Sequence, residues 1–401
     1  MTATDVSTPS AAAKPTCVLV LQGGGALGAY HIGAYEALVE RGFAPDWICG
    51  ISIGAINAAV IAGNPPEQRI ERLDALWHAI SWPMFAPVVE VAFPWLFNTI
   101  INSEAFVFGQ PNFFMPRPIN PYFAAPGLEA TSFYDTSPML ATLPQFVDFD
   151  LIASRAVRLS LGATEVETGD LVFFDNTTTR IGPEHVMASG SLPPGFPAIR
   201  IGERMYWDGG CVSNTPLEAV LEDQPAGHTV VFMVDLWNAA GPPPTTMAEV
   251  LWRQKQIQYA SRVTTHIDAV VDKVNLKHAI GLMKTEHLQG VSDPVPDTPG
   301  MRLGERLDVV HVVYRPTAGE TSTSDAEFSR RSIAARRAAG KRDMLAAIEA
   351  SPWLTVDKPR QVAAVVHRVE KGEIATRVKP DLHRTTGLRG KEGSATEVGA
   401  L

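Results

Sequence analysis

The sequence predicts an α/β fold with a mostly parallel central sheet, helices on its flanks and a C-terminal extension. Two observations predict this class. Apolar β-branched runs alternate with helix-like segments through the first 80 residues, and such alternation implies parallel strands joined by right-handed crossovers. The apolar content, 45% of 401 residues, provides core material for one large domain with extensions or for two modest domains.

The N-terminal part of the chain carries the clearest alternation. Its expected elements are a strand over 17–21, a helix over about 28–42, a strand over about 46–51, and helices over 52–62 and 67–79. Gly42 suits the C-cap of the first helix, and Asn64-Pro65-Pro66 ends the second.

The later elements alternate less regularly. We expect strands over 156–164, 171–174, 205–207, 229–236 and 307–314, and helices over 184–189 and about 246–286. Ser324 and Glu327 have the spacing of a capping box, which predicts the start of a final helix.

The most informative stretch of the chain is Gly50-Ile51-Ser52-Ile53-Gly54. The pattern G-x-S-x-G marks a nucleophile elbow, a sharp strand-to-helix turn that exposes a serine hydroxyl at the end of a sheet. Gly50 and Gly54 are needed because a Cβ at either position would collide with the neighbouring strand and helix. Ser52 is therefore the candidate nucleophile.

A glycine-rich loop, Gly23-Gly24-Gly25-Ala26-Leu27-Gly28, follows the first expected strand. A loop of this kind that leads into a helix leaves several backbone N–H groups unpaired and aimed at one point. This arrangement suits an anion, including the oxyanion that forms in acyl transfer. The loop thus offers a site for negative charge to accompany the serine.

Asp208 is the best candidate for the base that removes the serine proton. It ends a short apolar strand, and the functional groups of parallel sheets collect at such ends. Gly209 and Gly210 follow it and permit close approach of the backbone. Asp-Gly-Gly is also common as an ordinary turn, and that interpretation stays open.

The three motifs, in this order, resemble the patatin-like phospholipase family. G-G-G-x-x-G is followed by G-x-S-x-G and then by D-G-G, and the resemblance extends over 15–236. It includes Ala188-Ser189-Gly190-Ser191-Leu192-Pro193, which is similar to the A-S-x-A-x-P segment before the aspartate in this family. Beyond it, residues 328–331 and the helix after them look like the C-terminal extension of some bacterial members.

The resemblance implies a three-layer fold and a lipid acyl hydrolase that cleaves carboxylic esters by a Ser-Asp dyad. Ser52 is then the nucleophile that forms an acyl-enzyme, and Asp208 activates it. The oxyanion hole is assigned to the glycines of the loop, with the N–H groups of Gly24 and Gly25 as its donors: Gly23, Gly24, Gly25 and Gly28. The substrate is a lipid ester, and neither a metal nor a cofactor is implied.

The glycine loop departs from the family pattern at one position. Many members carry Arg or Lys where this chain has Leu27. A basic side chain there could assist an anionic headgroup or orient the loop. The substrate therefore stays open between phospholipid, lysophospholipid, neutral lipid and polyester.

The chain divides into four expected segments. They are a flexible N-terminal tail over 1–14, an acyl hydrolase domain over 15–238, a helical or mixed C-terminal extension over 239–379, and a disordered tail over 380–401. Within the domain, 81–125 holds 11 of the 32 aromatic residues but only three charged ones. This segment is expected to be an aromatic cap, either packed on the core or serving as a lid or acyl-chain channel.

Three competing interpretations remain. The glycine loop also fits the dinucleotide pattern G-x-G-x-x-G, but Asp46 stands before the second strand instead of at its end. An α/β-hydrolase triad would need a histidine after Asp208, although that fold places its elbow after several strands. The histidines that qualify by order are His228, His266, His278, His287 and His311. A non-enzymatic lipid-binding protein could keep the fold without using Ser52.

The bulk composition excludes several classes of protein. The net charge of −9 argues against nucleic acid as a partner, because phosphate binding needs concentrated positive charge. Cys17, Cys49 and Cys211 lack C-x-x-C spacing, so we expect neither a disulfide framework nor a zinc cage, and we expect a cytoplasmic location. The apolar run before Gln22 is too short for a signal peptide.

Peripheral, reversible contact with a membrane or lipid surface is the last expectation. The long uncharged stretches 15–35 and 47–66 are broken by glycine and polar residues, so they are assigned to the core and not to a membrane span. The aromatic residues of 81–125 suit the headgroup boundary. A basic cluster could add attraction to anionic lipid or could be a solvated helix face. It comprises Arg330, Arg331, Arg336, Arg337, Lys341 and Arg342.

Overall fold

The computed structural model of the chain describes most residues between 15 and 377. The described ranges are 15–81, 105, 107–127, 130–223, 225, 227–287, 306–315, 323–356, 358–360, 362–370 and 373–377. The expected tails, 1–14 and 380–401, lie outside the described residues, and so do 82–104 of the aromatic segment.

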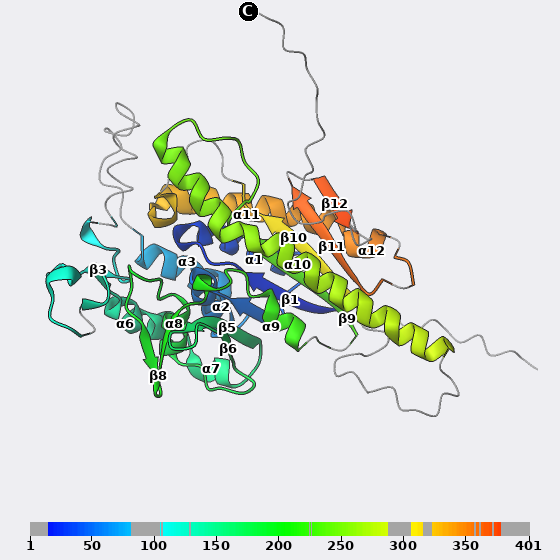
Figure 1. Cartoon of the computed structure of the whole chain (residues 1–401), viewed down its shortest axis with the longest axis horizontal. Helices are drawn as coiled ribbons and strands as arrows, with labels where there is room; N and C mark the ends of the chain where they lie inside the picture. The colour runs from blue at the N-terminus through cyan, green and yellow to red at the C-terminus, as the bar shows by residue number, and fades with distance from the viewer. Residues whose placement is uncertain are drawn as a thin grey trace, which may run out of the picture.

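A ten-stranded sheet forms the centre of the described structure (Figure 1). Its order is β12-β11-β10-β9-β1-β2-β5-β8-β7, with β6 paired to β5. All pairs from β11 to β5 are parallel, and β12, β6, β8 and β7 pair antiparallel. The predicted α/β class and mostly parallel sheet are thus confirmed. The strands are β1 (Thr16–Leu21), β2 (Trp47–Gly50), β5 (Arg158–Glu165), β6 (Leu171–Asp175), β7 (Ile199–Ile201), β8 (Arg204–Asp208), β9 (His228–Asp235), β10 (Arg306–Val313), β11 (Ala364–Glu370) and β12 (Glu373–Arg377).

Alternate side chains of β1 pack on opposite faces of the sheet, which makes three layers. Cys17, Leu19 and Leu21 join a core with α1, α2 and α11, whereas Val18 and Val20 join a second core with α9 and α10. Figure 1 shows α10 running diagonally across the front of the sheet. None of the helices in the described ranges combines the length and apolar character that crossing a membrane requires. The helices are α1 (Ala29–Glu40), α2 (Ile53–Ala62), α3 (Arg69–Ala79), α6 (Ser137–Phe146), α7 (Phe149–Ala153), α8 (Pro183–Ser189), α9 (Leu217–Glu222), α10 (Met247–His287), α11 (Arg330–Ala350) and α12 (Pro352–Thr355).

The last long helix begins later than its capping-box spacing predicted. Ser324–Ala326 forms only a short 3-10 turn, η5, and α11 begins at Arg330 with Ser329 as its N-cap. The buried Arg336 guanidinium donates hydrogen bonds to the backbone carbonyls of Ser324 and Glu327. The Ser324 carbonyl also accepts from the Glu327 N–H at 3.3 Å, so this segment closes a 3-10 turn that does not continue as an α-helix.

Helices α1 and α11 cross at very short range. A Cβ on Gly33 would lie 1.9 Å from the Arg337 carbonyl oxygen, and one on Gly340 would lie 2.0 Å from the Tyr30 carbonyl oxygen. Contacts this short exclude any larger residue at the crossing. The C-terminal segment is therefore seated directly on the N-terminal part of the fold.

The basic side chains of α11 near this crossing are paired within the protein. Arg337 forms ion pairs with Glu36 (3.1 Å) and Asp74 (2.6 Å), and Lys341 with Glu36 (2.9 Å) and Glu40 (3.0 Å). Acidic residues of α1 and α3 therefore neutralise two of the six residues of the basic cluster.

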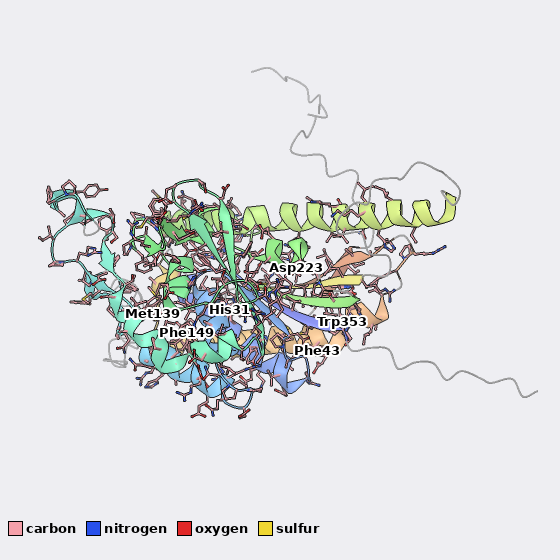
Figure 2. The ribbon with its side chains drawn as sticks, turned by 90° about the horizontal axis from the view of Figure 1, so that it is seen from below. His31, Phe43, Met139, Phe149, Asp223 and Trp353 are labelled. Atoms are coloured by element: carbon pink, nitrogen blue, oxygen red, sulfur yellow. The ribbon has the colours of Figure 1, made fainter. Side chains whose placement is uncertain are left out.

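An aromatic cluster attaches the chain after α11 to the sheet. Phe43 and Trp353 lie close to each other in Figure 2. The Trp353 ring packs edge-on against Phe43 and against Phe232 of β9, with both centroid distances 5.5 Å. The C-terminal extension therefore shares a core with the strands at the centre of the fold.

Candidate active site

Ser52 lies in a sharp turn between β2 and α2, as the G-x-S-x-G pattern predicted. Its backbone angles, φ 58° and ψ −126°, are sterically unfavourable for a residue with a side chain. Close packing holds the turn in place. A Cβ on Gly50 would lie 2.5 Å from the Gly54 carbonyl oxygen, and one on Gly54 would lie 2.3 Å from the Leu21 carbonyl oxygen.

The last residue of α8 and the residues that follow it support both the serine and the aspartate. The Ser52 N–H donates to the carbonyl oxygen (3.0 Å) and to Oγ (3.1 Å) of Ser189. The Ser189 hydroxyl donates in turn to the Gly162 carbonyl at 2.6 Å. Two residues later, the Ser191 carbonyl accepts from the Asp208 N–H at 2.9 Å. One short segment thus fixes the backbone of both candidate catalytic residues.

Asp208 reaches the serine by a different route from the one expected. Its strand, β8, runs antiparallel to β5 and is not a parallel strand that ends at the functional edge. In the register of the sheet, Gly50 lies opposite Leu161, and Asp208 lies opposite Ala163. Ser52, two residues beyond Gly50, is therefore level with Asp208. The antiparallel return of β8 brings the carboxyl group back to the turn.

The Asp208 carboxyl group is almost completely buried, with 1% of the residue exposed. Burial raises its pKa to about 7, although a hydrogen bond with the Ser52 side chain and one from the Gly210 N–H (2.7 Å) favour the ionised form. A carboxylate with a pKa near neutrality can accept a proton from a hydroxyl and return it.

The four glycines of the loop occupy three kinds of position. The Gly23 N–H is engaged, because it donates to the Asn214 carbonyl at 3.2 Å. Gly28 supports packing, since a Cβ there would lie 2.7 Å from the Ile53 side chain. Within the described part of the chain, the N–H groups of Gly24 and Gly25 have no protein acceptor, and both residues line the pocket beside Ser52.

A hydrogen-bond network behind the loop holds it in place. The Gln22 side chain accepts from the Leu236 N–H at 2.6 Å and donates to the Thr215 hydroxyl at 2.9 Å. The Trp237 indole N–H and the Asn214 amide both donate to the Gly23 carbonyl, each at 2.9 Å. The sequence interpretation missed these residues, although Trp237 could have been suspected because it follows a buried strand.

A mostly apolar cavity of about 300 Å³ opens beside Ser52 and Asp208. Aromatic side chains from several segments line it, namely Phe113, Phe114, Tyr134, Phe196, Trp237, Tyr259 and Phe328. Phe113 and Phe114 belong to the aromatic segment, and Phe114 lies 5.1 Å from Phe196 between ring centroids. The described part of that segment thus forms one wall of the pocket.

The C-terminal extension supplies another wall, which the sequence interpretation did not foresee. Lys255 and Tyr259 come from α10, and Asp325 and Phe328 come from η5 and the residues after it. The Asp325 carbonyl oxygen lies 2.2 Å from the position of a Cβ on Gly25, so η5 packs directly on the glycine loop. No local motif marks these residues, because only the fold brings them to the site.

Histidine is absent from the described residues that line the pocket. His228 pairs with Asp308 at 2.9 Å, and His311 pairs with Asp235 at 2.7 Å. Among the described residues, no group of three or more His, Cys, Asp and Glu side chains is placed to hold a metal ion. The charged groups at the pocket are therefore carboxylates and one amine.

Two family models match the chain. The model described as patatin-like phospholipase matches 19–221, and the model described as patatin phospholipase matches 257–360. The solved structure of VipD from Legionella pneumophila aligns over 88% of this chain and 72% of its own, with a TM-score of 0.38 and 15% identity.

Similar curated proteins match over shorter stretches. Patatin-like phospholipase domain-containing protein 6 of Homo sapiens is 35% identical over 79 residues, or 20% of this chain and 6% of that protein. Triacylglycerol lipase ptl3 of Schizosaccharomyces pombe is 49% identical over 53 residues, or 13% and 11%. Lysophospholipase NTE1 of Candida glabrata is 27% identical over 252 residues, or 58% and 11%. The chain thus spans only a small part of these relatives. The first family model alone covers just over half of the chain, which therefore belongs to the patatin-like phospholipase family.

Proposed function

We propose that the protein is a serine acyl hydrolase that cleaves carboxylic esters of lipids by a Ser52–Asp208 dyad. One observation carries the proposal: a serine in a strained elbow shares a hydrogen bond with a buried carboxyl group of raised pKa, beside an aromatic cavity. The family membership supports the same reaction class.

Acylation begins when the ionised Asp208 carboxylate takes the proton of the Ser52 hydroxyl. The Ser52 Oγ then attacks the ester carbonyl carbon, and the carbonyl oxygen becomes an oxyanion. The N–H groups of Gly24 and Gly25 are free to donate to it. When the tetrahedral intermediate collapses, the carbon–oxygen bond of the alcohol breaks. Asp208 returns its proton to that alcohol, and the acyl group stays on Ser52.

Deacylation repeats these steps with water as the nucleophile. Asp208 accepts a proton from the water, whose oxygen attacks the acyl carbon, and then returns the proton to Ser52 Oγ as the carboxylic acid leaves. The aromatic walls hold the acyl chain and limit the access of bulk water.

A Ser-Asp-His triad is less well supported than the dyad. The described lining residues include no histidine, and His228 and His311 are engaged by other carboxylates. A non-enzymatic lipid-binding role is the second alternative. A lipid-exchange assay with Ser52→Ala separates it from catalysis, since a binding protein would keep its full exchange activity.

The proposal includes reversible contact with a lipid surface. Tyr122 and Phe123, in the 3-10 turn η2 (Pro121–Phe123), are 83% and 85% exposed. Aromatic side chains of this kind suit the headgroup boundary of a bilayer. They belong to the same aromatic segment as Phe113 and Phe114, which line the pocket, so this segment would bring the pocket towards its substrate.

Labelling with a fluorophosphonate, followed by mass spectrometry, tests the nucleophile. We expect a single adduct on Ser52 and none in Ser52→Ala. A panel of p-nitrophenyl esters of increasing acyl length then tests the aromatic cavity, and kcat/KM should rise from acetate to medium-length chains. Labelling of a residue other than Ser52 would contradict the proposal. The absence of hydrolysis with every ester of the panel would also contradict it.

A further inference from the structure

Lys255 and Asp325 form an ion pair in the wall of the pocket. The Lys255 ammonium lies 2.8 Å from each of the two Asp325 carboxylate oxygens. Both side chains are partly exposed, at 32% and 23%. Among the described lining residues, Lys255 is the only cation, and Asp208 and Asp325 are the only anions. The pair is electrically neutral, so it adds no net positive charge to the site.

Other sources of positive charge at the pocket are scarce. Leu27, at the loop position where a basic residue would otherwise stand, is completely buried in the core. An anionic group bound here would meet an already neutralised ammonium and the Asp208 carboxylate, which must be ionised for catalysis.

We propose that the Lys255–Asp325 pair makes this site selective for acyl esters without net negative charge, such as glycerol or choline-type esters, over anionic ones. The inference rests on the proposed acyl-ester function. Asp325 acts as the specificity residue, because its carboxylate cancels the charge of Lys255, the one cation among the described lining residues. The selectivity then comes from weaker binding of anionic esters and not from additional contacts with uncharged ones.

Two substitutions change the pair in opposite directions. Asp325→Asn keeps the size of the side chain and removes the negative charge 2.8 Å from the Lys255 ammonium, so binding of an anionic ligand should strengthen. Lys255→Met leaves Asp325 as a second negative charge, so binding of the same ligand should weaken. The matched control is Glu349→Gln, which breaks the exposed Arg41–Glu349 ion pair (2.7 Å), whose residues do not line the pocket.

Calorimetric titration with two single-chain probes tests the inference without requiring hydrolysis. The probes are 1-O-dodecylglycerol, which is uncharged, and dodecyl phosphate, both below their critical micelle concentrations. The wild-type protein should bind the uncharged probe about tenfold more tightly. The ratio of the two dissociation constants should fall about tenfold in Asp325→Asn, rise in Lys255→Met and stay unchanged in Glu349→Gln.

The ratio of the two dissociation constants is insensitive to general damage to the pocket, because such damage weakens the binding of both probes. Equal wild-type affinity for the two probes, or an unchanged ratio in Asp325→Asn, would overturn the inference. A protein that shows the expected ratios but hydrolyses no ester would instead refute the proposed function and leave the charge selectivity standing.

Discussion

Asp208 and Asp308 are carboxyl groups buried in the same sheet, yet their pKa values shift in opposite directions. Asp208 accepts one backbone N–H, and it shares a hydrogen bond with a neutral serine. Asp308, which is completely buried in β10, meets Lys358, His367 (2.7 Å) and His228 (2.9 Å). The two sites differ in their partners and not in their burial.

This difference separates a reactive carboxyl group from a structural one. Burial alone raises the pKa of a carboxyl group, and at Asp208 it dominates. At Asp308, burial also acts to raise the pKa, but hydrogen bonds with His228, His367 and Lys358 outweigh it and hold the pKa well below its usual range. In the proposed dyad, Asp208 is the carboxylate available for proton transfer, whereas Asp308 joins three strands.

The largest expected effect is loss of ester hydrolysis in Ser52→Ala and Asp208→Asn. Each variant should lower kcat/KM by at least about 10³-fold, because each removes a group required for acylation. Hydrolysis of a p-nitrophenyl ester measures the change, and circular dichroism checks the fold. Turnover close to wild type in either variant would eliminate the dyad.

Asp308→Asn should lower the stability of the protein and leave its ester hydrolysis almost unchanged. Removing the carboxylate leaves the buried Lys358 ammonium without its counter-charge, which should lower the free energy of unfolding by about 3–5 kcal/mol. Denaturant titration at pH 7.5 measures this change. The kcat/KM per folded molecule should stay within about twofold of wild type, because Asp308 lies outside the pocket. A large loss of activity without loss of stability would show that Asp308 does not have the purely structural role that distinguishes it from Asp208.

The pH dependence should separate the two carboxyl groups again. Asp208 must be ionised to accept the serine proton, so kcat/KM should rise up to about tenfold per pH unit towards a plateau above about pH 7. Its pKa is raised in the folded state, so its contribution to stability is present at low pH and is lost as the pH rises to about 7. Asp308 has a lowered pKa, so its contribution is present at neutral pH and is lost in acid.

Asp208→Asn tests the stability part of this prediction. The variant has no buried charge to form, so relative to wild type it should gain about 2–3 kcal/mol of unfolding free energy between pH 5 and pH 8. Urea titrations of both proteins at the two pH values give the difference. An equal response of the two proteins to pH would mean that Asp208 does not titrate in this range.

The smallest expected effect concerns the surface beyond the pocket. The double variant Tyr122→Ser/Phe123→Ser should lower the fraction bound to vesicles severalfold and leave the hydrolysis of a soluble short-chain ester unchanged. Sedimentation with phosphatidylcholine–phosphatidylglycerol vesicles at low and high salt measures binding. Because Arg337 and Lys341 are paired internally, the salt dependence should be weak. Steep loss of binding in salt would point to basic residues instead of aromatic ones.

Much of the fold and the centre of the site could be predicted because their signals are local. The elbow around Ser52 needs its two glycines within four residues, and β1, β2 and α2 follow directly from short apolar patterns. Asp208 lies within hydrogen-bond reach of Ser52, but its strand runs in a direction that the sequence interpretation did not predict. A strand pattern does not state the direction of the strand, and β8 returns antiparallel to β5.

The remaining features depend on contacts between distant segments. The capping-box pattern at Ser324 was misleading, because this segment forms a 3-10 turn that is held by Arg336, twelve residues later. The role of Lys255 at the pocket depends on a partner 70 residues away. The basic residues of α11 looked free because their acidic partners lie about 300 residues earlier in the chain. Sequence patterns within one segment carry no signal for any of these pairs.

The pairing of β1 has a consequence for how the protein is made. β1 pairs with β2 on one side, but Thr16 on its other side lies opposite Thr229 of β9. During synthesis, β1 therefore keeps one edge unpaired while more than 200 further residues are translated. Such an edge invites pairing with other nascent chains, so we expect a chaperone to shield it. The same late segment supplies the Leu236 N–H that holds Gln22, so the glycine loop acquires its support only after β9 has emerged.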